Sequence, residues 1–313
     1  MNGLIKFRTM LEEFYIAHRR PCGYILRAVI LFVCMFIISR YIGFQAFISQ
    51  PWFIAILSLA LAFVPIRFIM IAVMAYTTVQ IFFLSYGIGF VTGVILIVMY
   101  LLYFRFAGQY GFLLMILPIL YLIKIPLAAV LVLAATGPAI SVITVIFGTT
   151  FYYLIHYIDV HAVAFASSSG ATEFEKGEML LQGVFTNREF LMMLVVMFVV
   201  FMIVHFVKRA NFSRSYELAI LIGTGVFIIL TVACELLFGD ITRAKLLYYC
   251  VGGVVSGAIA VFLTNIIKPL DYSRTETVEF EDEEYNYYVK AVPKVAFKTE
   301  TVSVKRINKR KDG

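Results

Sequence analysis

The sequence predicts an all-α polytopic integral membrane protein with about eight to ten transmembrane helices. Of its 313 residues, 62% are hydrophobic and 14% are charged, whereas about a quarter of the residues of a soluble domain are charged. The apolar residues form blocks of roughly 15 to 25, the length a helix needs to cross a hydrocarbon core of about 30 Å. These blocks lack the alternation of barrel strands, so helices are the expected spanning elements.

The N-terminal segment, residues 1–23, is expected to form a cytoplasmic amphipathic juxtamembrane helix. Its apolar residues recur at helical spacing, and five lysines and arginines lie within residues 1–27. Such a helix suits the surface of an anionic lipid leaflet. A solvated cap packed against the bundle is the alternative. The apolar residues in question are Leu4, Phe7, Leu11, Phe14 and Tyr15.

An N-terminal transmembrane bundle is expected over residues 24–158. Its first helix, 24–49, is interrupted at Arg40, and residues 52–86 hold two short helices that meet near Pro65 and Arg67. The next helix covers 89–106, a broken element follows over 112–136, and a helix over 140–158 ends in tyrosines, as expected at a membrane interface.

The second half of the chain is expected to begin with an extracytoplasmic polar loop, 159–189. A C-terminal segment of three spans follows over residues 190–268, and a cytoplasmic tail occupies 269–313. Lysine and arginine gather before the first span and around residues 208–214, so those sides are predicted to face the cytoplasm. Both termini of a multi-pass cell-membrane protein would then be cytoplasmic.

Prolines interrupt the middle of the chain. Pro118, Pro126 and Pro138 each remove a backbone donor, and the apolar runs between them are too short for a full crossing. The runs are either two halves of a kinked helix or a re-entrant hairpin. Backbone carbonyls freed at membrane depth are tolerated only where protein or a wet cavity covers them. A cavity is therefore predicted near Lys124 and Pro126.

A similar proline–cation break at Pro65 and Arg67 suggests an internal repeat, 52–106 against 112–158. Inverted repeats with broken helices at equivalent places occur in secondary transporters. Ionisable groups inside a span are functional candidates, although cations at span ends also snorkel to the headgroups. The predicted binding or pathway residues are Arg67, Lys124, Pro65, Pro126, Gly137, Pro138 and Arg40, with Glu235 as the available carboxylate partner for Arg40.

His156, Asp159 and His161 form a weak metal-site candidate. His156 and Asp159 would share a helical face, but His161 would join them only if the helix had ended. No metal or other cofactor is therefore assigned. Gly253 and Gly257, four residues apart, predict close helix packing, either within the bundle or between subunits.

The tail segregates an acidic, aromatic run from a basic end. Alternation over residues 285–292 and 295–307 predicts two short strands, while a disordered tail held at anionic lipid is the alternative. Residues 272–313 would pair with another subunit, making a homo-oligomer, or recruit a protein partner. Nucleic acid is not an expected partner.

Two functions are compatible with these features. The first is a transporter or permease-like protein for a small or anionic solute. The alternative is a non-catalytic membrane scaffold or assembly subunit that acts through its N-terminal helix and tail. No catalytic residues are predicted, because no nucleophile and base can be paired, so an enzyme is not expected.

Overall fold

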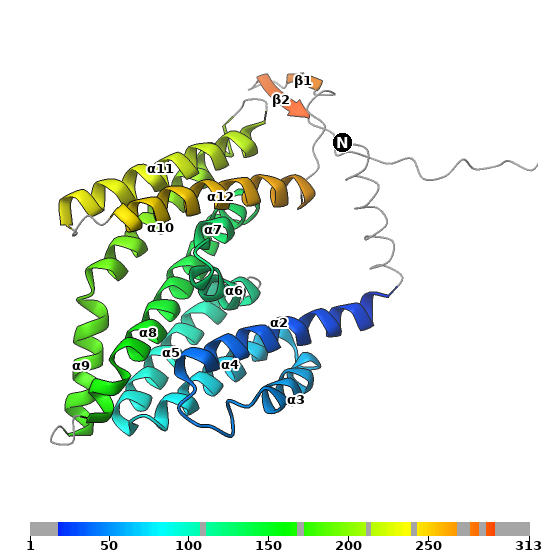
Figure 1. Cartoon of the computed structure of the whole chain (residues 1–313). Coiled ribbons are helices and arrows are strands. Elements are labelled where there is room, and N and C mark those ends of the chain that lie inside the picture. The colour runs from blue at the N-terminus through cyan, green and yellow to red at the C-terminus, as the bar shows by residue number, and fades with distance from the viewer. Residues whose placement is uncertain are drawn as a thin grey trace, which may run out of the picture. The chain divides into compact units, whose positions relative to one another are not determined.

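The computed structural model describes residues 18–106, 111–167, 172–210, 214–238, 243–267, 276–281 and 286–291. The chain divides into two compact units, Met1–Ile266 and Ile267–Gly313. The described part of the first unit is helical, and the second contributes two strands. Figure 1 shows the elements in chain order. The helices are α2 (Arg19–Ile42), α3 (Pro51–Ala62), α4 (Ile66–Phe82), α5 (Tyr86–Phe106), α6 (Gly111–Leu122), α7 (Pro126–Thr136), α8 (Val142–Ser167), α9 (Glu173–Phe185), α10 (Arg188–Val207), α11 (Ser215–Phe238) and α12 (Arg243–Ile267), with a short 3-10 helix η2 (Ala139–Ser141).

Six of the described helices are long and apolar enough to cross a membrane. Three shorter apolar helices accompany them, in α3, α4 and α7. The chain is therefore an all-α polytopic protein of the kind expected to cross a membrane several times. The six long segments are Pro21–Ile42, Tyr86–Arg105, Ala139–Ser167, Arg188–Val207, Ser215–Leu237 and Leu247–Asn265.

Helix boundaries agree with the sequence at Pro65, Pro126 and Pro138, whereas α6 continues through Pro118, which was expected to interrupt it. α3 and α4 are two short helices that meet at Pro65, and α10, α11 and α12 match the three spans expected in the C-terminal half. The N-terminal amphipathic helix lies outside the described residues, except that its last five residues belong to α2.

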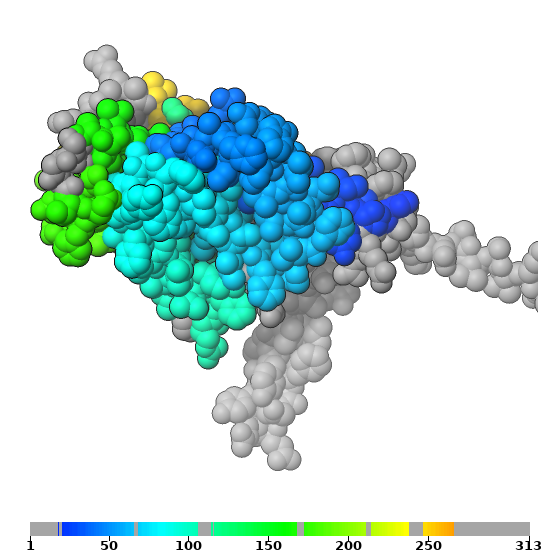
Figure 2. Space-filling model, turned by 90° about the horizontal axis from the view of Figure 1, so that it is seen from below, coloured from blue at the N-terminus to red at the C-terminus, as the bar shows by residue number. Residues whose placement is uncertain are grey.

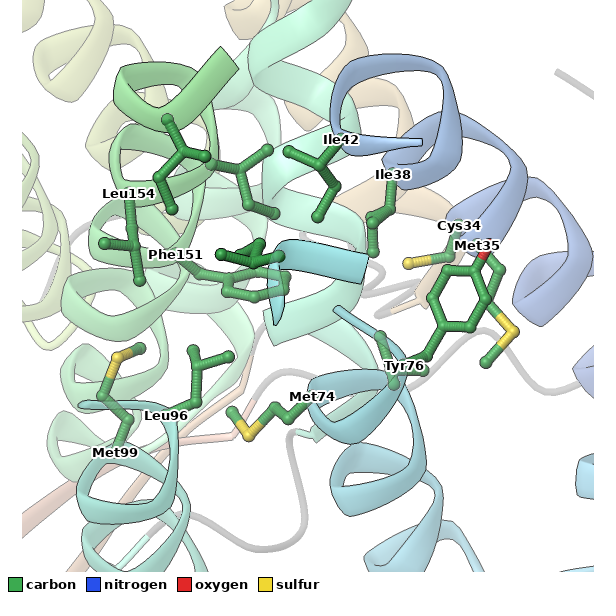
Figure 3. Close-up of a cluster of buried hydrophobic side chains, with 14 of the residues drawn as sticks. Cys34, Met35, Ile38, Ile42, Met74, Tyr76, Leu96, Met99, Phe151 and Leu154 are labelled. Carbon is green, nitrogen blue, oxygen red and sulfur yellow. The ribbon is translucent and has the colours of Figure 1, made fainter. Parts of the chain in front are cut away.

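The first hydrophobic core lies among α2, α4, α5 and α8. Figure 3 shows Cys34 and Met35 of α2, Met74 and Tyr76 of α4, and residues of α5 and α8 around the same interior. Gln80, fully buried in α4, hydrogen-bonds the backbone N–H of Gln45 and the hydroxyl of Ser49. Its polar side chain therefore fixes the turn that leads from α2 to α3.

The second core surrounds α7. Nine of its eleven residues are buried, and α7 packs against α10 and α11. The buried side chains of α10 that face this core include Met193, Met197 and Phe201. A short helix that is buried almost all round is sheltered by protein, as the proline pattern predicted.

The first helix was predicted to extend over 24–49 with an interruption at Arg40, and its extent is wrong. α2 continues past Arg40, which is exposed in its last turn, and ends at Ile42 before Gly43. The guanidinium lies over the ring of Phe36, 5.1 Å from its centroid. A Cβ atom at Gly43 would overlap the carbonyl oxygen of Ser39, so this glycine is what allows the chain to turn.

The segment expected to be a polar loop, residues 159–189, is mostly helical. α8 extends to Ser167, and α9 occupies Glu173–Phe185. A capping box begins α9: the hydroxyl of Thr172 accepts from the backbone of Glu175, and the Glu175 carboxylate accepts from the backbone of Thr172. Two otherwise unpaired donors are satisfied in this way.

Glycines bring α11 and α12 into close contact. A Cβ atom at Gly257 would lie 2.5 Å from Thr224 Oγ1, and one at Gly253 would lie 3.1 Å from Ile228 Cγ1. Both neighbours belong to α11 of the same chain. Of the two kinds of packing considered for this pair, the structure therefore contains the intrachain one.

The second unit contains an antiparallel hairpin of β1 (Glu276–Glu281) and β2 (Asn286–Ala291). The strand expected over residues 285–292 overlaps β2, but its partner is β1 in the acidic run. The strand expected over 295–307 lies outside the described residues. The register pairs Val278 with Val289 and Phe280 with Tyr287.

Candidate functional site

The break between α6 and α7 is a Schellman motif with lysine at the position that usually holds glycine. The backbone N–H of Ile125 donates to Leu120 O at 2.9 Å, and that of Lys124 donates to Tyr121 O at 3.1 Å. These are the two hydrogen bonds that define the motif. Lys124 has φ 65°, in the left-handed region that costs an L residue about 1–2 kcal/mol.

Lys124 faces an aromatic surface supplied by α12. Its Nζ lies 5.3 Å from the centroid of the Tyr248 ring, a distance at which a cation and a ring attract. A Cβ atom at Gly252 would lie 2.8 Å from the carbonyl oxygen of Lys124. Gly252 therefore allows α12 to pack directly against the break. Among the described residues, no carboxylate forms an ion pair with Lys124.

The aromatic surface continues through α6 and α8. The rings of Tyr121 and Tyr152 stack with centroids 4.5 Å apart, and the Tyr121 hydroxyl is 3.0 Å from Thr149 Oγ1. Tyr152 in turn stacks on His156 at 5.6 Å. Ring faces and hydroxyls from α6, α8 and α12 thus gather beside the break.

Two small cavities adjoin the break. One, of about 10 Å³, lies between Lys124, Pro126, Met193 and Tyr249, and this is about the space that a single water requires. The other, of about 20 Å³, lies between α2, α6 and α8 beside Pro118 and Tyr152. Neither cavity is large enough to hold a solute, whereas Lys124 itself is exposed.

The N-terminus of α7 lies at the same region. Pro126, the first residue of α7, has no N–H, and the N–H groups of Ile125 and Ala128 donate to Leu120 O and Ile125 O. The helix dipole places partial positive charge there. The dipole adds to the charge of Lys124 beside it.

The C-terminus of α7 is held by a lysine from α10. Pro138 has no N–H for the carbonyl of Ala134, four residues earlier, so the break leaves that acceptor free. Lys208 Nζ donates to Ala134 O and to Gly137 O, both at 2.6 Å. A cation at a helix C-terminus is also favoured by the dipole.

α6 and α7 run in opposite senses. Leu117 lies against Gly148, and Tyr121 lies against Tyr152, so α6 is parallel to α8. Leu127 lines a cavity with Met193, and Ala134 bonds Lys208, so α7 is parallel to α10.

α8 and α10 are themselves antiparallel. α8 begins just after Gly137, which bonds Lys208 at the end of α10, whereas the ring of Tyr153 contacts that of Phe190 near the start of α10. Because α6 is parallel to α8 and α7 is parallel to α10, α6 and α7 are antiparallel. The chain therefore reverses direction at Lys124.

The structure does not bring all of the predicted site residues together. Lys124 and Pro126 form the break described above, and Gly137 and Pro138 lie at the other end of α7. The Pro65 break is separate, because Phe63 contacts Tyr24 near the start of α2. The side chain of Arg67 is not among those described. Arg40 lies in the last turn of α2 and not in the site.

The metal-site candidate fails on geometry. α8 continues through His156, Asp159 and His161, so the condition that would bring His161 to the other two is not met. His161 Nδ1 lies 2.9 Å from the carbonyl oxygen of Tyr157 on its own helix. Among the described residues, no group of three or more His, Cys, Asp or Glu side chains lies close enough to hold a metal ion.

Lys208 and Tyr248 are the site residues that sequence reasoning missed. Lys208 was counted as a loop cation, and its role appears only when α10 is packed beside α7. Tyr248 carried no signal beyond being an aromatic residue near a span end. Comparison with known protein families, with curated proteins and with solved structures finds no match to this chain.

Proposed function

We propose that this chain is a transporter or permease-like protein of the cell membrane, and that it carries a small anionic or zwitterionic solute past Lys124. One observation carries the proposal: lysine occupies a left-handed helix-end position with its ammonium beside Tyr248. Glycine would fit this backbone without strain. Strain of this kind gathers at functional sites, so a requirement for the charge explains why a lysine is there.

The electrostatics of α7 favour the same class of solute. The positive end of a half-helix dipole attracts anions, and transporters use such half-helix ends near the bilayer midplane. Here the end of the half-helix lies next to a lysine that no described carboxylate pairs with. Aromatic rings around the lysine offer an apolar wall for the rest of the solute.

The α6–α7 pair is proposed to be a re-entrant hairpin. Each helix is about 16–18 Å long at 1.5 Å per residue, about half the thickness of a hydrocarbon core, and the two run in opposite senses. α3 is as short as α6 but is counted as a crossing, because it ends at Phe63 beside Tyr24 at the start of α2. With α3 and α4 as two short crossings, the chain has eight crossings and one re-entrant pair. Both termini are then on the same side, which the basic residues Lys208, Arg209 and Arg214 assign to the cytoplasm, facing anionic lipid.

Flux in reconstituted vesicles tests transport. The wild-type chain, Lys124→Gly and Lys124→Arg are compared for uptake of radiolabelled phosphate, lactate and glutamate, with glucose as the neutral probe. Lys124→Gly keeps the left-handed backbone and removes the charge, so uptake of the transported anion is expected to fall about tenfold, a loss of about 1.4 kcal/mol. Lys124→Arg is expected to retain part of it. Arg40→Ala, which removes an exposed cation outside the site, serves as the control. Equal uptake by wild type and Lys124→Gly would reject the proposal.

A non-catalytic scaffold or assembly subunit is the second candidate. The hairpin of β1 and β2 supports it, because a two-stranded hairpin is marginal in water without a further partner. A second copy of the chain, giving a homo-oligomer, or a protein partner at residues 272–313 would supply the missing contacts. Deleting residues 272–313 and measuring the number of subunits in the purified particle tests this. An unchanged number of subunits would argue against a homo-oligomer formed through the tail.

A further inference from the structure

An apolar groove of about 430 Å³ lies between α5 and α9, away from the Lys124 site. Its walls are formed by Tyr86, Phe90, Phe174 and Leu181. Three of these side chains are among the most exposed apolar groups of the chain, with Phe174 at 82%, Tyr86 at 75% and Phe90 at 66%. Figure 2 shows green residues of α8 and α9 adjoining the cyan surface of the N-terminal helices.

A fixed contact between α5 and α9 forms one end of the groove. Glu173 Oε2 accepts from the Ser85 hydroxyl at 2.5 Å and from the Gly87 backbone N–H at 2.8 Å. A side chain at Gly87 would overlap the backbone of Glu173, and one at Gly177 would lie 2.7 Å from Val91. Two glycines and a carboxylate therefore set the spacing of the helices, so the groove is formed before anything binds.

The size and lining of the groove suit a hydrocarbon chain. An apolar cavity of about 150 Å³ is enough for benzene, and this groove has almost three times that volume. α9 lies alongside α5 at one edge of the bundle (Figure 1), with Glu173 against Gly87 and Gly177 against Val91. Gly87 is at the start of α5, which is long enough to cross a membrane, so the first turn of α9 lies where a spanning helix reaches the lipid headgroups.

The charges at the groove are mostly negative. Glu173, Glu175 and Glu178 lie in the first turns of α9, against one cation, Lys176, which pairs with Glu173 at 2.9 Å. The hydrogen bond from Ser85 and then that from Gly87 lower the pKa of Glu173 to about 2, so this carboxyl group is ionised at neutral pH. Glu178 lines the groove itself and accepts from Gln182 at 2.9 Å.

We infer that this groove binds one acyl chain of a phospholipid with an ammonium headgroup, phosphatidylethanolamine, and that Glu178 faces the ammonium. The apolar walls take the chain, and the surplus of carboxylates attracts the ammonium and repels a headgroup with net negative charge. The inference needs the first turn of α9 to lie at the membrane surface, but it does not depend on transport.

Native mass spectrometry of the full-length protein tests this site with two lipids of equal chain length. Phosphatidylethanolamine is expected to bind about fivefold more tightly than phosphatidylglycerol, the effect of about one interfacial charge. Glu178→Gln keeps the acceptor for Gln182, and is expected to remove most of that preference. Leu181→Trp fills the groove and is expected to weaken binding of both lipids.

Matched controls lie on the same helix. Glu175→Gln removes a carboxylate outside the groove and keeps a capping-box residue, and Met179→Trp adds bulk at an exposed position that does not line the groove. Both are expected to bind lipid as the wild type does. Equal or tighter binding of phosphatidylglycerol, or lipid binding that Leu181→Trp leaves unchanged in a folded protein, would overturn the inference.

Discussion

Lys208 Nζ lies 2.6 Å from the carbonyl oxygen of Ala134, the acceptor that Pro138 leaves without its helical donor. A side chain 74 residues further along the chain thus supplies what proline removed. The same amine also bonds Gly137 O. One lysine therefore closes the C-terminal end of a half-length helix whose N-terminal end lies at the candidate site.

Replacing Lys208 with methionine is expected to loosen α7. The variant leaves the two carbonyls without their donor, and a hydrogen bond to a charged group contributes about 1.5–3 kcal/mol. Hydrogen exchange should accelerate in residues 126–137 more than in α5, and the melting temperature in detergent should fall. Arg40→Met, which removes an exposed cation with a ring contact, is the control. Unchanged hydrogen exchange in α7 would show that the hydrogen bonds from Lys208 do not stabilise this helix.

Lys124→Gly and Lys124→Ala are expected to differ in stability, although both remove the charge. Alanine keeps the strain of a left-handed residue, whereas glycine relieves it, by about 1 kcal/mol. Thermal unfolding should therefore give a higher melting temperature for Lys124→Gly than for Lys124→Ala. The reverse order would mean that Lys124 does not have φ near 65° in solution.

The Glu173 contact is expected to be sensitive to acid. The pKa of Glu173 in the folded protein, about 2, lies below the ordinary glutamate value of 4.5, so the stability that the contact contributes is present above about pH 4.5 and is lost as pH falls towards 2. The melting temperature of the wild type should exceed that of Glu173→Gln at pH 7. The difference between the two melting temperatures should shrink as the pH falls from 4.5 to 2. A difference in melting temperature that is constant over that range would argue against an ionised Glu173 in this contact.

Two glycine substitutions are expected to have opposite effects. Gly257→Ala introduces a Cβ atom 2.5 Å from Thr224 Oγ1, and overpacking of this kind costs about 1–3 kcal/mol. Gly225→Ala meets nothing within 4 Å and is expected to stabilise α11 by about 0.4–1 kcal/mol. Melting curves of the two variants check the pair. Similar shifts in both would contradict the close contact of α11 and α12.

The sequence predicts where helices break better than it predicts which side chains pack at the breaks. Proline acts on its own backbone, so the divisions at Pro65 and Pro126 follow from local chemistry. The capping box at Thr172 and Glu175 was equally visible as a T-x-x-E pattern, and it would have identified α9. Residues 159–189 were instead predicted to form a loop, because their composition is polar.

The errors at Arg40 and Lys208 have another cause. Whether a cation in an apolar segment is interior depends on where its helix ends, and Gly43 ends α2 seven residues earlier than the apolar pattern does. Lys208 acts on a partner from a distant part of the chain, which no local periodicity encodes. The internal repeat stays a prediction: α4 packs on α5, whereas α7 packs on α10 and α11.

The most direct test of the account is the environment of residue 124 in a lipid bilayer. A spin label at Lys124→Cys, in a chain whose four native cysteines are replaced by serine or alanine, reports both membrane depth and contact with water-soluble relaxation agents. We expect a label near the middle of the bilayer that water-soluble agents still reach. A label that only oxygen dissolved in the lipid reaches, or one that lies at the headgroups, would contradict a sheltered polar break within the membrane.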